Sequence, residues 1–214
     1  MSTTPRRTYN NSRRRADAEM RQRRIVEAAA ALFVEQGFAG TSIDQIAAAA
    51  DVSPQTVYAT YGSKAAVLSR AIDVAVVGDY EAERLADRLP ALADPTSEQQ
   101  HVYFAAAAHF VRSMHERVAP LMRVLEQSAA TDPALEELRQ KIVRDVRAAG
   151  PIWITQLGSA LSPSLSVAEA ADVLLTIQSP YVYSALTVDL GWSPDRYEQW
   201  LAEAIPKLLL RPGL

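Results

Sequence analysis

The chain has 214 residues, of which 49% are hydrophobic, 22% charged and 7% aromatic, a composition typical of globular proteins. It has no cysteine, which excludes disulfides, thiolate metal sites and cysteine nucleophiles and fits a reducing cytoplasm. No apolar run approaches the roughly 18 residues that cross a bilayer, and no apolar segment follows the basic N-terminus as in a secretory signal. We therefore expect no membrane partner.

The net charge of −3 hides an asymmetry along the chain. Residues 1–24 contain eight arginines and two acidic residues, whereas residues 65–214 contain thirteen basic and nineteen acidic residues. Because the N-terminal part is basic and the rest of the chain is acidic, we expect the N-terminal part to be the one that attracts a polyanion. A solubilising tail would give the same count, so charge alone favours nucleic acid only weakly.

The first predicted helix covers roughly residues 16–36 and follows a basic flexible arm, residues 1–15. Its apolar positions recur at helical spacing on one face, with arginines opposite them. Gly37 is placed to end this helix in the left-handed conformation, and Phe38 to pack back onto its last turn.

Two short helices follow, at about 42–50 and 54–61. Thr41 and Asp44 have the spacing of a capping box, and Ser53-Pro54 is a helix start with serine as N-cap and proline at the first position. Neither helix would be stable alone. Together they predict a helix-turn-helix whose second helix enters a DNA major groove. An ordinary helical hairpin is the alternative.

The segment from Phe33 to Ala71 resembles the N-terminal DNA-binding domain of the TetR (tetracycline-repressor type) family of bacterial regulators. It departs from that pattern at Asp51, where the family usually has glycine, and at Tyr61, where phenylalanine is commoner. Aspartate tolerates a positive φ angle, so the turn should remain intact. The matching residues are Phe33, Gly37, Phe38, Thr41, Ile46, Ala47, Ala50, Val52, Ser53, Val57, Tyr58, Lys64 and Leu68.

The resemblance implies that the 54–61 helix lies in the major groove, where Gln55 could read an adenine. Thr41 and Ser42, with the free amides of the 42–50 helix, would bind a phosphate, and Lys64 would add a point charge. Tyr61 is also a candidate for the core of this small domain. The expected DNA-binding residues are Arg13, Arg14, Arg15, Thr41, Ser42, Ser53, Pro54, Gln55, Thr56, Tyr58, Thr60, Tyr61 and Lys64.

Residues 64–214 read as helical throughout, so the predicted fold is all-α with about nine helices. The expected domains are the DNA-binding domain at 16–63 and a ligand-binding and dimerisation domain at 64–214. The helices of this second domain are predicted at about 64–89, 98–117, 120–131, 133–161 with a kink at Gly150-Pro151, 167–190 with a bend at Pro180, and 194–210.

The last two predicted helices are apolar on more than one face, which indicates an association surface. The resemblance implies a homodimer that presents two recognition helices to a pseudo-palindromic operator, with half-sites about 34–36 Å apart. Completion of a monomer core is the alternative. The expected interface residues are Val173, Ile177, Val188, Tyr197, Trp200, Leu201, Ala204 and Leu208.

Aromatic and methionine side chains with a few polar groups suit a pocket for a small, partly apolar effector. Any one of them could equally be core. The candidates are Tyr103, Phe104, His109, Phe110, Met114, Met122, Glu126, Trp153, Gln178 and Tyr181. Such an effector would act by shifting the population of conformations and moving the 64–89 helix.

Other function classes fit the sequence less well. The three histidines, His101, His109 and His115, lack the i, i+4 spacing of a helical metal pair, and no P-loop, GxGxxG or GxSxG motif is present. We therefore expect no catalysis, no metal and no cofactor. The sequence favours a ligand-responsive repressor of a bacterial cytoplasm, associated with the nucleoid, over the alternative of a helical binding or scaffold protein without DNA binding.

Overall fold

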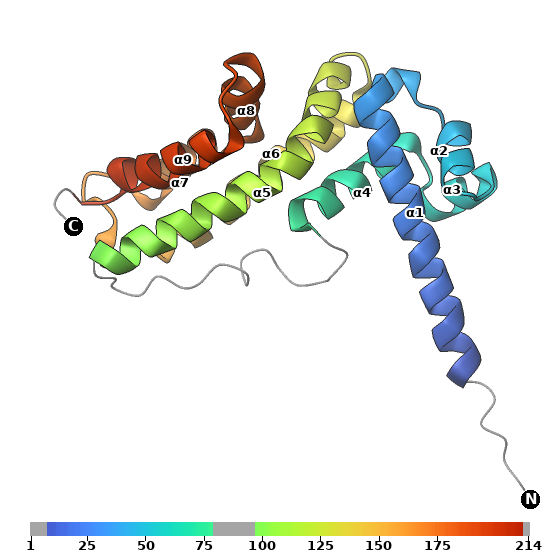
Figure 1. Cartoon of the computed structure of the whole chain (residues 1–214), viewed down its shortest axis with the longest axis horizontal. Coiled ribbons are helices and arrows are strands. Elements are labelled where there is room, and N and C mark those ends of the chain that lie inside the picture. Colours follow the sequence, from blue (N-terminus) through green and yellow to red (C-terminus); the bar gives the residue numbers. More distant parts are fainter. Residues whose placement is uncertain (1–7, 79–96, 212–214) are drawn as a thin grey trace, which may run out of the picture. The chain divides into compact units, whose positions relative to one another are not determined.

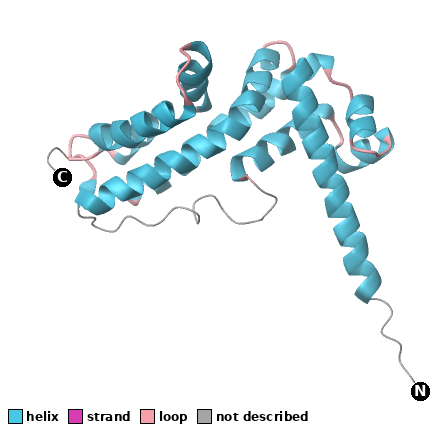
Figure 2. Cartoon of the chain, viewed as in Figure 1, coloured by secondary structure: helices cyan, strands magenta, loops and turns pink. Residues whose placement is uncertain are grey.

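The structure, a computed structural model, describes residues 8–78 and 97–211, with side chains in 13–78 and 100–211. In these ranges helices are the only regular elements apart from an isolated bridge between Leu161 and Leu210, which confirms the all-α class (Figures 1 and 2). None of the helices described is long and apolar enough to cross a membrane. The chain divides into two compact units, Met1–Val74 and Ala75–Leu214.

The first unit contains α1 (Thr8–Gly40), α2 (Ile43–Ala49), α3 (Pro54–Tyr61) and most of α4 (Lys64–Val77). The bounds of α3 match the prediction. Gly37 has φ 72° and interrupts α1 as expected, and Phe38 stacks on Phe33 with ring centroids 5.7 Å apart. The buried core of this unit includes Ile25, Phe33, Ile46, Val57 and Leu68.

Two bounds in this unit differ from the prediction. The expected flexible arm is helical from Thr8, and its residues 1–7 lie outside the described range. Arginine, alanine, glutamate and methionine favour helix there, and Arg15 pairs with Glu19 one turn on at 3.0 Å. The predicted 64–89 helix ends at Val77, because Gly78 adopts φ 85° and leaves the helical region. The rest of that prediction, to Leu89, falls within the undescribed residues 79–96.

The second unit contains α5 (Ser97–Ala129), α6 (Pro133–Thr155), α7 (Val167–Ile177), α8 (Pro180–Ser184) and α9 (Pro194–Leu209). Three helices start where they were predicted to start, and each has a capping residue: Asp132 for α6, Ser166 with Glu169 for α7, and Ser193 for α9. Each cap places a side-chain oxygen on backbone amides that lack a partner inside the helix, so these starts could be predicted locally.

Four predicted helices of the second unit have other bounds. The helices expected at 98–117 and 120–131 are one helix, because Ala119, Leu121 and Met122 are buried and their packing outweighs the bond lost at Pro120. Conversely, the helix expected at 167–190 breaks at Ser179, which caps a new helix at Pro180 and is followed by a π-helical turn, Ala185–Asp189.

The helix expected at 133–161 ends at Thr155, and a 3₁₀ turn, Gly158–Ala160, follows it. Gly150, in the predicted kink, has a packing role. A Cβ atom there would lie 3.0 Å from Leu175 and 3.2 Å from Ala171, so glycine permits the close approach of α6 and α7.

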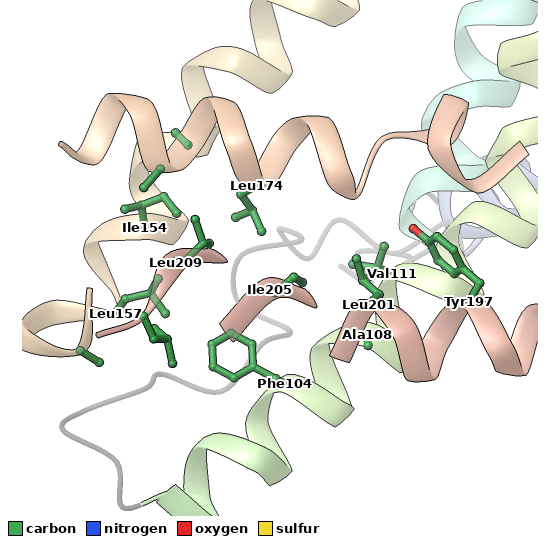
Figure 3. Close-up of a cluster of buried hydrophobic side chains, with 14 of the residues drawn as sticks. Phe104, Ala108, Val111, Ile154, Leu157, Leu174, Tyr197, Leu201, Ile205 and Leu209 are labelled. Atoms are coloured by element: carbon green, nitrogen blue, oxygen red, sulfur yellow. The ribbon is translucent and has the colours of Figure 1, made fainter. Parts of the chain in front are cut away.

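The core of the second unit joins α5, α6, α7 and α9, as Figure 3 shows. Its buried members on α9 are Tyr197, Leu201, Ile205 and Leu209, which recur every fourth residue and therefore share one face. After α9 the chain is tied to the segment following α6, where the Ser162 amide donates to the Leu209 carbonyl at 2.8 Å. This packing holds α5 and α9 side by side.

Tyr183 and Tyr197 of this core form a buried aromatic group with His115. The Tyr183 and Tyr197 rings meet edge to face with centroids 4.9 Å apart, and the Tyr197 hydroxyl lies 3.3 Å from His115 Nδ1. His115 is 1% exposed, and burial lowers its pKa from 6.5 to about 4. Its imidazole is therefore neutral in the folded protein at neutral pH.

We expect the buried His115 to make the stability depend on pH. Between pH 6.5 and about 4 the unfolded chain binds a proton that the folded chain excludes, so the free energy of unfolding falls as the pH falls across this window. The loss attributable to His115 should reach about 3 kcal/mol. Urea unfolding at pH 7.5, 5.5 and 4.5 measures it.

The contribution of His115 is isolated by a variant, since carboxyl groups also titrate in this window. His115→Gln removes the titrating group and keeps a polar side chain beside Tyr197, so its stability should fall less steeply with acid than that of the wild type. Gln127→Ala, which replaces an exposed side chain that does not titrate, should follow the wild-type slope. Equal slopes in all three proteins would contradict the assignment.

Candidate functional site

The start of α2 is capped by Ser42, one residue later than predicted. The Ser42 hydroxyl accepts from the Gln45 amide at 3.1 Å, and the Gln45 side chain accepts from the Ser42 amide at 2.7 Å, which completes the capping box. Thr41 is 1% exposed, and its hydroxyl donates to the carbonyls of Gly37 at 2.8 Å and Leu32 at 3.1 Å. The expected phosphate contact of the Thr41 side chain is therefore replaced by closure of the end of α1, while Ser42 stays exposed.

The turn between α2 and α3 places α3 as a helix-turn-helix requires. Asp51 adopts φ 53°, as its tolerance of the left-handed region allows. Ser53 then caps α3 by accepting from the Thr56 amide at 3.2 Å, with Pro54 at the first helical position. Val57 is 1% exposed and is the residue of α3 that anchors it in the core.

The opposite face of α3 is exposed and carries the predicted reading residues. Gln55 is exposed, and Tyr58 is 54% exposed. The hydroxyl of Thr56 lies 2.9 Å from that of Ser53, and the hydroxyl of Thr60 donates to the Thr56 carbonyl at 2.7 Å. Thr56, Ser53 and Thr60 thus already use their hydroxyls within the helix, whereas the Gln55 amide points outward for an external partner.

Tyr61 lies at the junction of α3 and α1 and is half-buried. Its hydroxyl is 3.4 Å from the Gln22 carbonyl oxygen, and burial raises its pKa. This position fits the packing role weighed for Tyr61 better than the expected DNA contact. Tyr61 therefore joins the end of α3 to α1.

The Lys64 ammonium points into the domain, in contrast to the predicted phosphate contact. Lys64 Nζ donates to the carbonyls of Phe38 and Thr41, at 2.7 Å each, and lies 4.2 Å from the centroid of the Phe38 ring. Two of its three N–H groups are therefore used by the chain between α1 and α2. We assign Lys64 the role of holding this turn; its contact with DNA stays a prediction.

We expect Lys64→Met to destabilise the DNA-binding domain. The variant loses two charge-assisted hydrogen bonds to half-buried carbonyls, which should lower the free energy of unfolding of the domain by about 1.5–3 kcal/mol. Amide hydrogens of α2 and α3 should exchange about tenfold to hundredfold faster, as measured by hydrogen exchange of the full chain. Lys207→Met, which removes an exposed lysine of α9, should leave this exchange unchanged. Unchanged exchange in Lys64→Met would contradict the role.

The predicted basic residues Arg13, Arg14 and Arg15 are exposed and lie on α1 rather than on a flexible arm. Arg15 is engaged by Glu19. Three further arginines of the same helix, Arg21, Arg23 and Arg24, are exposed and were not among the predicted DNA-binding residues; Arg21 and Arg24 lie on the side of Arg13 and Arg14. The count of arginines in residues 1–24 signalled them, but only a continuous helix gives them a common direction.

The ten expected effector residues do not form one small site. Phe104 and Glu126 both lie on α5, and 22 helical steps separate them by about 33 Å along the axis. Phe104 is buried in the core of the second unit, against which Tyr103, Phe110 and Trp153 pack. Met122 is also buried, Met114 and Gln178 are half-buried, and His109 is turned to the surface, where it lies 3.1 Å from Glu198.

Glu126 and Tyr181 form a polar pair between α5 and α8. The Tyr181 hydroxyl donates to the Glu126 carboxylate, and burial together with this bond raises the Tyr181 pKa. Arg139 of α6 interacts electrostatically with both groups and is bidentate to Glu136, at 2.7 and 2.8 Å. Sequence spacing did not bring Arg139 into this group. The structure thus divides the predicted effector residues into an apolar set and a polar set.

The residues predicted for the dimer interface fall into two groups, core residues and residues that remain at least partly exposed. Tyr197 and Leu201 are fully buried in the chain's own core, so they are corrected to core residues. A neighbouring face of α9 remains, with Trp200 and Ala204 half-buried and Leu208 48% exposed. Val173 and Ile177 of α7 are half-buried, Val188 is 58% exposed, and Leu190, which was not predicted, is 68% exposed.

Comparison with known proteins agrees with this geometry. Residues 25–71 match the family of bacterial regulatory proteins described as the tetR family. A segment of 57 residues is 42% identical to the HTH-type transcriptional repressor SCO4008 of Streptomyces coelicolor. That match covers 27% of this chain and 30% of the repressor, so it spans about a third of the relative's length.

Two solved structures have a similar fold over most of the chain. NalD of Pseudomonas aeruginosa, the secondary repressor of the MexAB-OprM multidrug efflux pump, has a TM-score of 0.70 at 22% identity, over 92% of this chain and 100% of that one. A SmeT–triclosan complex has a TM-score of 0.68 at 20% identity, over 90% and 93% of the two chains. At these identities the likeness is one of fold.

Proposed function

We propose that this chain, whose residues 25–71 are a TetR-family DNA-binding domain, is a ligand-responsive transcriptional regulator that binds a pseudo-palindromic operator as a homodimer. The observation that carries this proposal is the exposed face of α3. It presents Gln55 and Tyr58 outward from a helix that Ser53 caps and Val57 anchors. A rigid helix with one buried and one free face is what insertion into a major groove requires.

Contacts with DNA divide into reading and positioning. Gln55 can pair bidentately with adenine N6 and N7, and the Tyr58 hydroxyl can donate to a phosphate. The exposed Ser42 and the N-terminus of α2 can bind a second phosphate. The scaffold alternative has no comparable use for this free face, and SCO4008, the relative of the domain, is a transcriptional repressor.

The effector is proposed to be a small, partly apolar molecule. SmeT has been solved with triclosan, and the apolar and polar sets of this chain offer aromatic and hydrogen-bonding groups of the corresponding kinds. We propose that the effector contacts either the set around Phe104 or the set around Glu126, but not both. Binding protein rather than enzyme is the proposed class, in the cytoplasm of a bacterium, at its nucleoid.

The helix α4 is proposed to carry the response to the effector. The two units meet within it, between Val74 and Ala75. Lys64 holds its first turn, and Arg117 Nε donates to the Ala75 carbonyl near its last turn at 3.0 Å. An effector that binds one conformation of the second unit better than another would shift the population and release the operator, which makes the protein a repressor.

Selection of bound duplexes from a random pool by the full-length protein tests the proposal. We expect recovery of a sequence with two-fold symmetry, and loss of binding when an effective small apolar compound is added. Recovery of no preferred sequence at low salt would overturn the proposed function. A preferred sequence without two-fold symmetry would overturn the dimeric mode of binding.

A further inference from the structure

The N-terminal half of α1 extends beyond the packed part of its unit. Between Arg13 and Arg24 no side chain is buried, and burial begins at Ile25. The contacts of this half with the rest of the unit include those of Gln22 with Tyr61 and of Arg24 with Asp51. Figure 1 shows this part of α1, in dark blue, running on past α2 and α3. Burial among the residues with described side chains, 13–78 and 100–211, therefore does not account for it.

Four arginines of this extension share one side of the helix. At 100° per residue, Arg13, Arg14, Arg21 and Arg24 fall within about 100° of one another, on a stripe that also contains Asp17. We call these four residues the arginine stripe. Arg15 and Arg23 lie on other sides of the helix by the same count, and Arg15 is paired with Glu19. The stripe keeps a net positive charge although Asp17 lies within it.

The stripe lies on the side of α1 from which α3 begins. Arg24 Nη1 lies 3.5 Å from the Asp51 carboxylate, and Asp51 is in the turn immediately before α3. Arg24 is the member of the stripe nearest to the first turn of α3, where Gln55 is exposed. The other members lie farther toward the N-terminus of α1, so the stripe runs away from that turn. A duplex that receives the first turn of α3 would therefore pass close to Arg24.

We propose that the arginine stripe binds the phosphate backbone of DNA next to each half-site and so lengthens the contact with the operator. From Arg13 to Arg24 the helix rises about 16 Å, which corresponds to about five base pairs of duplex. This inference rests on the proposed function. It adds a positioning surface, separate from the reading face of α3, that carries affinity but little sequence information.

The electrostatics of α1 support a polyanion as the partner. Arg13, Arg14 and Arg21 carry charges of the same sign on one side of the helix and repel one another. Few tertiary contacts compensate for this along the extension. Phosphates would neutralise the arginines and also interact favourably with the positive end of the helix. A neutral or basic partner would supply neither effect.

The test compares two double variants with the same change in charge on the same helix. Arg14→Gln/Arg21→Gln removes two residues of the stripe, and Arg15→Gln/Arg23→Gln removes two that lie off it. Binding to the selected duplex is measured between 50 and 200 mM salt, with eight flanking base pairs on each side and with these flanks removed. Thermal unfolding checks that both variants are folded.

The stripe predicts a difference between the two variants. On the flanked duplex, Arg14→Gln/Arg21→Gln should reduce the log–log salt slope by about 2 to 4, since two side chains on each of two protomers contribute about 0.9 apiece. Arg15→Gln/Arg23→Gln should change it by less than one. On the duplex without flanks, the salt slopes of the wild type and of Arg14→Gln/Arg21→Gln should be nearly equal.

Two other results would overturn the stripe while leaving the proposed function intact. If both variants lose the same slope, diffuse charge rather than the stripe attracts DNA. If neither variant differs from the wild type on a duplex that the wild type has selected, the extension does not touch DNA. Failure of the wild type to select any sequence would instead overturn the proposed function, and the stripe with it.

Discussion

Replacing Gln55 by alanine is expected to abolish most of the protein's preference for its operator without abolishing its attraction to DNA. Gln55 is exposed on the first turn of α3, and its amide can pair with both edge groups of an adenine. Such a bidentate contact discriminates by about 1–3 kcal/mol. A dimer makes this contact twice. The difference in binding free energy between the operator and a random sequence should therefore shrink by about 2–6 kcal/mol.

The measurement is a titration of Gln55→Ala with the selected duplex and with a random-sequence duplex of equal length. Affinity for the random duplex, which depends on phosphates, should remain within about a factor of two of the wild type. Gln127→Ala removes an exposed glutamine of α5 and should leave both affinities unchanged. An equal loss on the two duplexes would show that Gln55 positions the helix and does not read a base.

Ala204→Arg is expected to separate the dimer and to weaken operator binding by about a hundredfold or more. Ala204 lies on the face of α9 that also contains Trp200 and Leu208, next to the fully buried face. A charged side chain in the middle of an apolar interface would be buried without a partner. Loss of the second half-site removes an avidity of about 10²–10⁴.

Sedimentation velocity at micromolar concentration measures the dimer, and a duplex titration measures operator affinity. Gln199→Arg, about 140° around the same helix from Ala204, introduces the same side chain as a control and should remain dimeric. Leu201→Ala should instead lower stability by about 2–5 kcal/mol, because Leu201 is a core residue. A dimeric Ala204→Arg protein that binds normally would place the interface elsewhere.

Much of the first unit followed from short-range chemistry. The three-helix pattern around Gly37, Ser53-Pro54 and Gly62 depends on caps and φ angles that involve only neighbouring residues, and the bounds of α3 were predicted correctly. The hydrogen bonds of Thr41 and Lys64 inside the domain were not predicted, because they include carbonyl groups 9 and 23 residues away along the chain. A hydroxyl or an ammonium has the same sequence signature whether it faces a phosphate or the protein's own backbone.

In the second unit, local patterns determined where helices start, through Asp132, Ser166 and Ser193, and indicated that α9 is apolar on more than one face. The tertiary structure alone decided that Pro120 lies within a helix while Pro180 begins one, and that Tyr197 faces the core while Ala204 does not. Capping satisfies groups within one turn, so it can be predicted from a few residues. Burial depends on which distant surface packs against a helix, and that surface exists only in the folded chain.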